Sequence, residues 1–214
     1  MYSIYDKMIK KKQYQKEIER RVVSAKEGDV FIPSDFFDIT EATTVNKILE
    51  RLVEKKLIRK IGRGLYDKPI FSHLLQEYQV PKMEEIAQAL ARNYNWHIVP
   101  AGDTALNLLG LSTQVTAHWT YLSDGPYRIY AFGNTKLQFK HTANKNISKM
   151  SQRSALIIQA LRALGKEVVA DAGMLEQISK ALGSEDKQSL LVEAKYSTAW
   201  IYKTVKSLCD EEIN

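Results

Sequence analysis

Apolar and polar positions alternate with a helical period at the start of the chain. The apolar positions Ile4, Met8, Tyr14, Ile18 and Val22 have charged residues between them. This spacing predicts one or two amphipathic helices over residues 4–23. A short β-prone run at residues 30–32 follows, and Ser34 after Pro33 is a suitable N-cap for a brief helix.

A second pair of elements follows directly. Thr40 can cap a helix whose apolar positions obey the i, i+3, i+4, i+7 rule, namely Ala42, Val45, Ile48, Leu49, Leu52 and Val53. Residues 57–67 contain two short apolar segments around Gly62-Arg63-Gly64, a pattern typical of a β-hairpin. The order of helix, strand, short helix, longer helix and basic hairpin predicts a winged helix-turn-helix in residues 1–75.

The polar face of the longer helix and the hairpin supply candidate DNA contacts. Recognition helices read base edges and phosphates with hydrogen-bonding side chains, and an arginine at a hairpin tip suits a narrow minor groove. Glu41 and Glu50, on or near the same face, depart from a purely basic surface. The candidate DNA-binding residues are Thr43, Thr44, Lys47, Arg51, Arg59, Lys60 and Arg63.

The rest of the chain has a different pattern. Pro69 and Pro81 bracket a connecting stretch, so a second domain is expected over residues 76–214. Helices are expected at 83–91 and 103–109, a strand at 96–100, and a three-stranded antiparallel meander at 117–141. Further helices are expected at 154–164, at 175–182 closed by Gly183, at 186–192, and around Trp200. The predicted fold class is therefore α+β.

Composition and charge narrow the class of protein. The chain has 214 residues, 44% of them apolar, and only one cysteine, Cys209, which excludes an internal disulfide or a thiolate zinc cage. No signal-peptide or membrane-spanning pattern is present, so a cytoplasmic location is expected. The net charge of +6 is concentrated in the first seventy residues, which hold 16 Lys or Arg against 11 Asp or Glu. This excess favours an anionic partner there.

The sequence lacks the motifs of the common enzyme classes. His73, His97, His118 and His141 are scattered without metal-ligand spacing, and no phosphate-binding loop or nucleophile elbow occurs. We therefore expect no enzyme, no metal and no cofactor. One enzymatic hypothesis stays open, in which Asp103 and Asp124 hold a metal ion for chemistry on nucleic acid.

Several segments carry a resemblance to a known family. Residues 62–67 (Gly-Arg-Gly-Leu-Tyr-Asp), 100–115, 121–126 and 196–200 resemble the AbiEi antitoxin family of type IV toxin–antitoxin systems, and in particular its branch labelled as a domain of unknown function. The resemblance covers nearly the whole chain. It implies an N-terminal winged helix that binds inverted repeats in its own promoter and a C-terminal domain needed for antitoxicity.

These observations lead to one principal hypothesis. The chain is expected to be a sequence-specific DNA-binding autorepressor and antitoxin, working with a nucleotidyltransferase-type toxin that it need not contact directly. A homodimer is expected if the operator is an inverted repeat, because two-fold DNA symmetry is read by two-fold proteins. The alternative is a protein-interaction module that binds a toxin or another protein without binding DNA.

Overall fold

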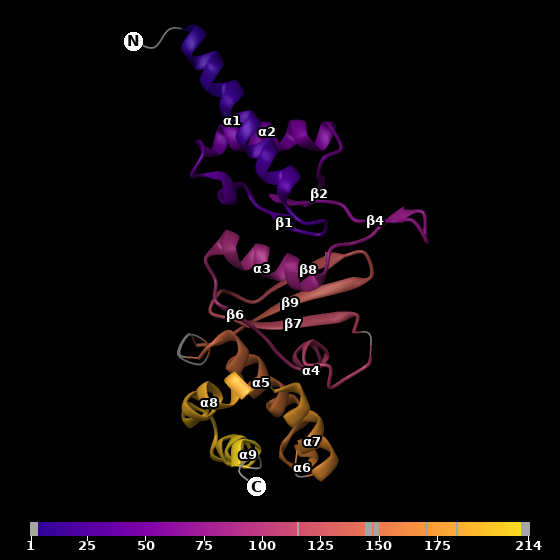
Figure 1. The fold of residues 1–214 in the computed structure, drawn as a ribbon, viewed down its shortest axis with the longest axis vertical. Helices are drawn as coiled ribbons and strands as arrows, with labels where there is room; N and C mark the ends of the chain where they lie inside the picture. The colour runs from indigo at the N-terminus through magenta and orange to yellow at the C-terminus, as the bar shows by residue number, and fades with distance from the viewer. Residues whose placement is uncertain are drawn as a thin grey trace. The chain divides into compact units, whose positions relative to one another are not determined.

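The computed structural model describes residues 4–114, 116–143, 147, 150–169, 171–182 and 184–210. The expected helix-closing Gly183 and Val115 of the family-like segment lie outside these residues. The chain divides into two compact units, Met1–Asn95 and Trp96–Asn214 (Figure 1). The fold is α+β in both, and each unit has its own sheet and core.

The first part of unit 1, up to Asp67, contains three helical elements and a three-stranded antiparallel sheet. The helical elements are α1 (Ile4–Ser24), the 3₁₀ helix η1 (Pro33–Phe36) and α2 (Ala42–Glu54). The strands are β1 (Val30–Phe31), β2 (Arg59–Gly62) and β3 (Leu65–Asp67). The sheet order is β1-β3-β2, so the hairpin strand β3 lies in the centre. The expected elements between residues 4 and 67 are thus confirmed as helices and strands.

The core of unit 1 forms where the apolar stripes of the helices meet the sheet. Ile18 and Val22 of α1 are fully buried, as are Leu49 and Leu52 of α2. Phe36 of η1 lies in the same cluster. The helical period of α1 and α2 places these side chains on one face, and their removal from water stabilises the unit.

Two of the expected helix caps are wrong. The residue before the 3₁₀ helix is Ile32, whose backbone N–H donates to the Asp35 carboxylate at 2.9 Å, so Ser34 lies inside the helix. The residue before α2 is Glu41 in an extended conformation, one position after Thr40. Pro33 accounts for the first difference, because proline is favoured at the first helical position.

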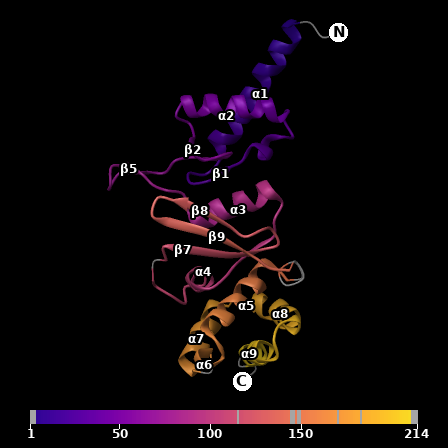
Figure 2. The ribbon, with the colours of Figure 1, turned by 180° about the vertical axis from the view of Figure 1, so that it is seen from behind.

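Unit 1 continues past residue 75, where the sequence interpretation ended the first domain. A second hairpin, β4 (Phe71–Ser72) with β5 (Glu77–Tyr78), projects from the unit (Figures 1 and 2). Helix α3 (Met83–Tyr94) follows and packs against β1. Its Arg92 donates to the Val30 carbonyl and to the Asp35 carboxylate. These long-range contacts join α3 to unit 1, and no sequence pattern signals them.

Unit 2 is built on a four-stranded sheet. Its strands are β6 (Ile98–Pro100), β7 (His118–Ser123), β8 (Arg128–Phe132) and β9 (Thr135–His141). The order is β6-β7-β9-β8, with β7 and β9 parallel and the other pairs antiparallel. The expected antiparallel meander is therefore wrong: β9 inserts between β7 and β8. The tight turn at Gly133 joins β8 and β9 as a hairpin, but the hairpin pairs with β7 through its second strand.

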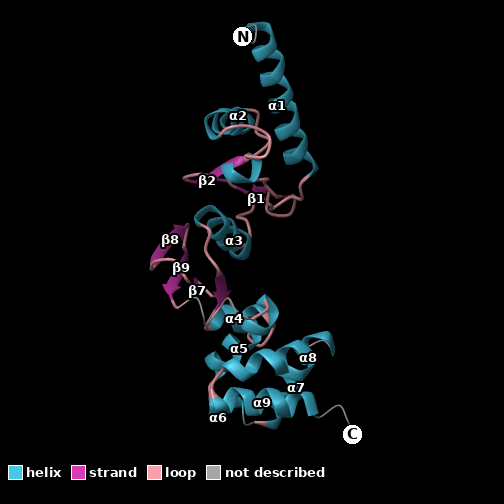
Figure 3. Cartoon of the chain, turned by 90° about the vertical axis from the view of Figure 1, so that its left-hand side faces the viewer, coloured by secondary structure: helices cyan, strands magenta, loops and turns pink. Residues whose placement is uncertain are grey.

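The helices of unit 2 gather on the β6–β7 side of the sheet, away from β8 and β9 (Figure 3). Apolar residues of α5 and α9 form most of their core, including Ile157, Leu161, Ile201 and Val205. The helices are α4 (Asp103–Leu108), α5 (Gln152–Leu164), α6 (Lys166–Val169), α7 (Ala172–Ala181), α8 (Ser184–Glu193), η3 (Ala194–Tyr196) and α9 (Ala199–Asp210). Within the described residues, no helix is both long and apolar enough to cross a membrane.

Candidate nucleic-acid interface

The outer face of α2 carries most of the candidate DNA contacts. Val45, Ile48 and Leu49 point into the core, whereas Thr43, Asn46, Lys47, Glu50 and Arg51 are exposed and Thr44 is half-buried. The amphipathic period predicted this division correctly. The β2–β3 hairpin follows α2 directly in the chain, and both belong to unit 1. One compact unit therefore contains the polar face of α2 and the basic hairpin.

Glu41 forms hydrogen bonds with the first turn of α2. Its carboxylate accepts hydrogen bonds from the hydroxyls of Thr43 at 3.0 Å and Thr44 at 3.3 Å. A carboxylate at this end of a helix is favoured by the helix dipole. Both threonines are therefore engaged within the protein, and an incoming phosphate would have to compete with Glu41 for them.

Contacts to α1 hold the C-terminal half of α2. Arg51 donates to the side-chain oxygen of Gln15 at 3.3 Å, and Lys55 pairs with Glu19 at 2.9 Å. Both pairs are exposed, so each stabilises the packing only slightly. These contacts orient α1 and α2. The hydrogen bond of Arg51 to Gln15 is weak enough for a ligand to replace it.

Arg59 has an internal role in the hairpin. Its guanidinium pairs with Asp67, which lies opposite in the β2–β3 register and whose side chain is 1% exposed. The Nε atom donates to the same carboxylate at 3.1 Å, a terminal nitrogen donates to the Gln79 carbonyl at 2.7 Å, and the ring of Tyr78 lies 5.4 Å away. Arg59 therefore neutralises a buried charge and contacts the end of the second hairpin through Tyr78 and Gln79.

Three of the seven candidate residues are basic and unengaged. Lys47 on α2, Lys60 on β2 and Arg63 at the hairpin tip are exposed, and none has an ion pair or side-chain hydrogen bond within the described part of the chain. The tip can turn tightly because Gly64 has φ +68°. These three cations are exposed to solvent on α2 and on the β2–β3 hairpin.

The structure adds two basic residues that are not among the seven candidates from the sequence. Lys10 and Lys11 of α1 line an open groove with Thr40, Glu41 and Thr44 at the start of α2. Only the packing of α1 on α2 brings them there, since about thirty residues separate the two segments. Lysine spacing within α1 could not have indicated this neighbour.

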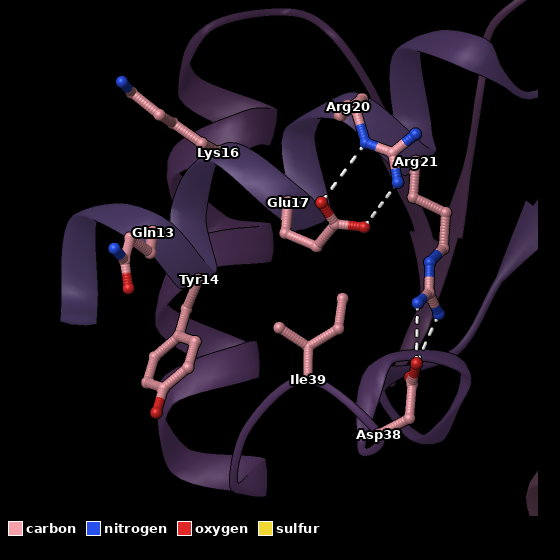
Figure 4. A pocket seen from close by; sticks show the side chains of 8 residues that line it. All are labelled: Gln13, Tyr14, Lys16, Glu17, Arg20, Arg21, Asp38 and Ile39. Carbon is pink, nitrogen blue, oxygen red and sulfur yellow. Dashed lines mark hydrogen bonds and ion pairs between the residues drawn. The ribbon is translucent and has the colours of Figure 1, made fainter.

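In a larger groove on α1, four of the five charged side chains form ion pairs with one another, and Lys16 is the fifth. The groove measures about 580 Å³ and is lined by Gln13, Tyr14, Lys16, Glu17, Arg20, Arg21, Asp38 and Ile39 (Figure 4). Arg20 pairs with Glu17 and Arg21 pairs with Asp38, as the dashed lines show. These hydrogen bonds hold the pKa values of both carboxyl groups below their ordinary values. The groove therefore has little unpaired charge to offer an ionic ligand.

Asp103 and Asp124, the two metal ligands of the enzymatic hypothesis, have different local environments. Asp124 accepts a hydrogen bond from the backbone N–H of His97 at 2.9 Å and contacts its Nδ1 at 2.8 Å. Asp103 is exposed in the first turn of α4. The described residues contain no group of three His, Cys, Asp or Glu side chains that could hold a metal ion.

Comparisons with known proteins place the chain in a family. A family model described as a family of unknown function (DUF6088) matches residues 17–190. None of the curated proteins matches the chain. Among solved structures, the RV2827C protein from Mycobacterium tuberculosis is similar with a TM-score of 0.44 and 11% identity, over 92% of this chain and 76% of that chain. The family model spans most of both units, and the chain belongs to the DUF6088 family of unknown function.

Proposed function

We propose that this protein is a sequence-specific DNA-binding autorepressor that docks on duplex DNA through a winged helix-turn-helix in unit 1. We further propose that it is the antitoxin of a type IV toxin–antitoxin system. The observation that carries the first proposal is the sheet order β1-β3-β2, with η1 and α2 inserted between β1 and the hairpin.

That connectivity supports a winged helix because each element has a counterpart in the motif. Helix α1, η1 and α2 supply three helices, of which α2 takes the place of the recognition helix. The hairpin of β2 and β3 takes the place of the wing, and β1 closes the sheet against β3. A 13-residue amphipathic helix with a buried inner face is rigid enough to present its outer face to a major groove.

The candidate residues that form no ion pair or side-chain hydrogen bond within the described residues are expected to contribute most of the DNA-binding energy. Lys47 on the helix, with Lys60 and Arg63 on the hairpin, can contact phosphates or a minor groove without breaking an internal ion pair. Arg51, Thr43 and Thr44 can contribute by exchanging a weak partner. Arg59 is expected to act indirectly, by holding the hairpin in place through Asp67.

The antitoxin assignment depends on the resemblance of the sequence to the AbiEi family. Family membership as DUF6088 carries no function of its own, so this half of the proposal depends on residues 62–67, 100–115, 121–126 and 196–200. It implies a neighbouring nucleotidyltransferase-type toxin and a homodimer on inverted repeats. Co-expression of that toxin with and without this protein tests it by cell survival.

The binding test uses a labelled duplex from immediately upstream of the gene and a scrambled duplex of equal length. Fluorescence anisotropy at several salt concentrations gives the affinity and its salt slope. We expect tighter binding to the upstream duplex, and a salt slope that falls by about 0.9 for each phosphate contact removed. Lys47→Glu and Arg63→Glu are the test variants.

The matched control is Lys203→Glu, an exposed lysine on α9 in unit 2. It changes net charge by the same amount without altering the helix or the hairpin. If Lys203→Glu weakens binding as much as Lys47→Glu and Arg63→Glu do, overall charge and not the unit 1 surface attracts the DNA. Equal affinity for the two duplexes would refute a sequence-specific repressor.

One observation favours a second candidate, a protein-interaction module. The β4–β5 hairpin exposes Leu74 (91% of its surface), Leu75 and Tyr78, and Val80 just after it is exposed as well. Clustered exposed apolar side chains are a feature of protein-binding surfaces. If this candidate holds, the neighbouring toxin co-purifies with the protein, Leu74→Glu abolishes the co-purification, and the upstream duplex is not bound.

A further inference from the structure

Charge is distributed unevenly within unit 2. Residues 125–166 contain no Asp or Glu, and their basic residues are Arg128, Lys136, Lys140, Lys145, Lys149, Arg153, Arg162 and Lys166. The nearest preceding carboxylate, Asp124, is engaged by His97. A segment this long without an acidic residue gives the adjoining surface a positive potential, which attracts polyanions.

Strands β8 and β9 fall inside that segment, and part of their sheet is open. In the β8–β9 register, Ile129 is opposite Gln138 and Ala131 is opposite Lys136, so these residues share one face. On the same face, Leu122 of β7 packs with Val99, Ile147 and Ala155 under α5. The β6–β7 half is therefore covered, whereas the described part of the chain leaves Ile129, Ala131 and Lys136 of the β9–β8 half exposed. We call this half the open half-sheet: Tyr127, Ile129, Ala131, Lys136, Gln138 and Lys140.

The open half-sheet combines cations with an exposed ring. Tyr127 is 58% exposed and Ile129 is 52% exposed. The Gln138 side-chain amide donates to the Tyr127 hydroxyl at 2.8 Å, which fixes the ring beside β9. Lys136 and Lys140 are exposed at alternate positions on the same strand, on either side of Gln138. In contrast, the opposite face of the sheet buries Tyr121, Leu137 and Phe139.

This combination fits a ligand that carries both phosphates and bases. Single-stranded nucleic acid is bound by aromatic side chains on which bases stack and by cations that follow the backbone. A duplex hides its base faces and would leave the Tyr127 ring unused. An acidic peptide would use the lysines, but its Asp and Glu side chains have no flat rings to stack on Tyr127.

We propose that the open half-sheet binds single-stranded nucleic acid, with Tyr127 stacking on a base and Lys136 and Lys140 contacting the phosphates on either side. The site lies in unit 2 and does not depend on the duplex binding proposed for unit 1. RNA and single-stranded DNA share the required chemistry, and the experiment separates them.

The test measures fluorescence anisotropy of labelled U12 RNA and dT12 DNA with the full chain carrying Lys47→Glu and Arg63→Glu, which weakens the proposed unit 1 surface. We expect binding of at least one single strand, and tighter binding of it than of an equally long duplex. Tyr127→Ala should weaken it at least about fivefold, the lower end of one base stack, whereas Tyr127→Phe keeps the ring and most of the affinity. Lys136→Glu with Lys140→Glu should reduce the salt slope by roughly 1.4.

The control is Lys203→Glu with Lys206→Glu, two exposed lysines of α9 that give the same change in net charge. Equal loss of affinity in the control would show that net charge, and not the sheet, holds the strand. The proposal is overturned if neither single strand binds at 50 mM salt, if the duplex binds as tightly, or if Tyr127→Ala has no effect. It is also overturned if poly-L-glutamate displaces the strand as well, charge for charge, as unlabelled U12 does.

Discussion

The ion pair between Arg59 and Asp67 gives the sharpest test of how the β2–β3 hairpin is held. Arg59→Leu removes the partner of a carboxylate whose side chain is 1% exposed, and leaves that charge in the sheet of unit 1. Removing one member of a buried pair costs about 3–5 kcal/mol. The Arg59 side chain is 32% exposed, so water can partly replace it. We therefore expect a cost below that range, about 2–3 kcal/mol.

Amide hydrogen exchange is the suitable assay, because it resolves the two units. All three tryptophans, Trp96, Trp119 and Trp200, belong to unit 2, so tryptophan fluorescence does not report on unit 1 directly. Peptides covering residues 45–67 should exchange faster in Arg59→Leu, while tryptophan fluorescence stays unchanged. Faster exchange at constant pH measures the lower free energy of opening.

Two further variants test the role of the ion pair between Arg59 and Asp67. Lys60→Leu replaces the exposed neighbour on the same strand and should change the opening free energy by less than about 0.5 kcal/mol. Arg59→Leu with Asp67→Leu removes both charges and should restore most of the stability, because no carboxylate is then stranded. An Arg59→Leu protein as stable as the natural one, or a double variant less stable than Arg59→Leu alone, would refute the role assigned to this pair.

Three other predictions concern unit 2. A Cβ at Gly125 would lie 2.3 Å from the Trp96 ring, so Gly125→Ala should destabilise the unit by about 1–3 kcal/mol and shift its tryptophan emission; an unshifted melting curve contradicts this. Ser151 caps α5 by accepting from Ser154 N–H, so Ser151→Ala should cost about 0.5–2 kcal/mol in urea unfolding followed by tryptophan fluorescence. Burial opposes ionisation of Glu193, but hydrogen bonds from Ser154 and Ser151 prevail and lower its pKa. Its stabilisation is therefore present above the ordinary glutamate pKa and lost as pH falls through the lowered value, so the stability gap to Glu193→Gln should close on acidification from pH 7 to pH 3.

The local period of apolar residues was enough to predict most individual elements. Helix α2 was predicted from the spacing of its apolar residues, and the β2–β3 hairpin from Gly62-Arg63-Gly64. These predictions succeed because a helix or hairpin obeys rules within a few residues of sequence. Thr40 and Ser34 failed as caps for a related reason: several neighbouring residues are acceptable, and the exact boundary depends on packing.

Pairing between distant segments was decided only by the tertiary structure. Strand β9 lies between β7 and β8, and no short-range pattern distinguishes this order from a meander. The contact of α3 with the rest of unit 1 through Arg92 is also set by the tertiary structure. So is the role of Arg59, because Asp67 lies opposite it on the neighbouring strand. Sequence determined which side chains are polar and which elements carry them. The fold decided which of those side chains form ion pairs or hydrogen bonds within the protein, because their partners come from distant parts of the chain.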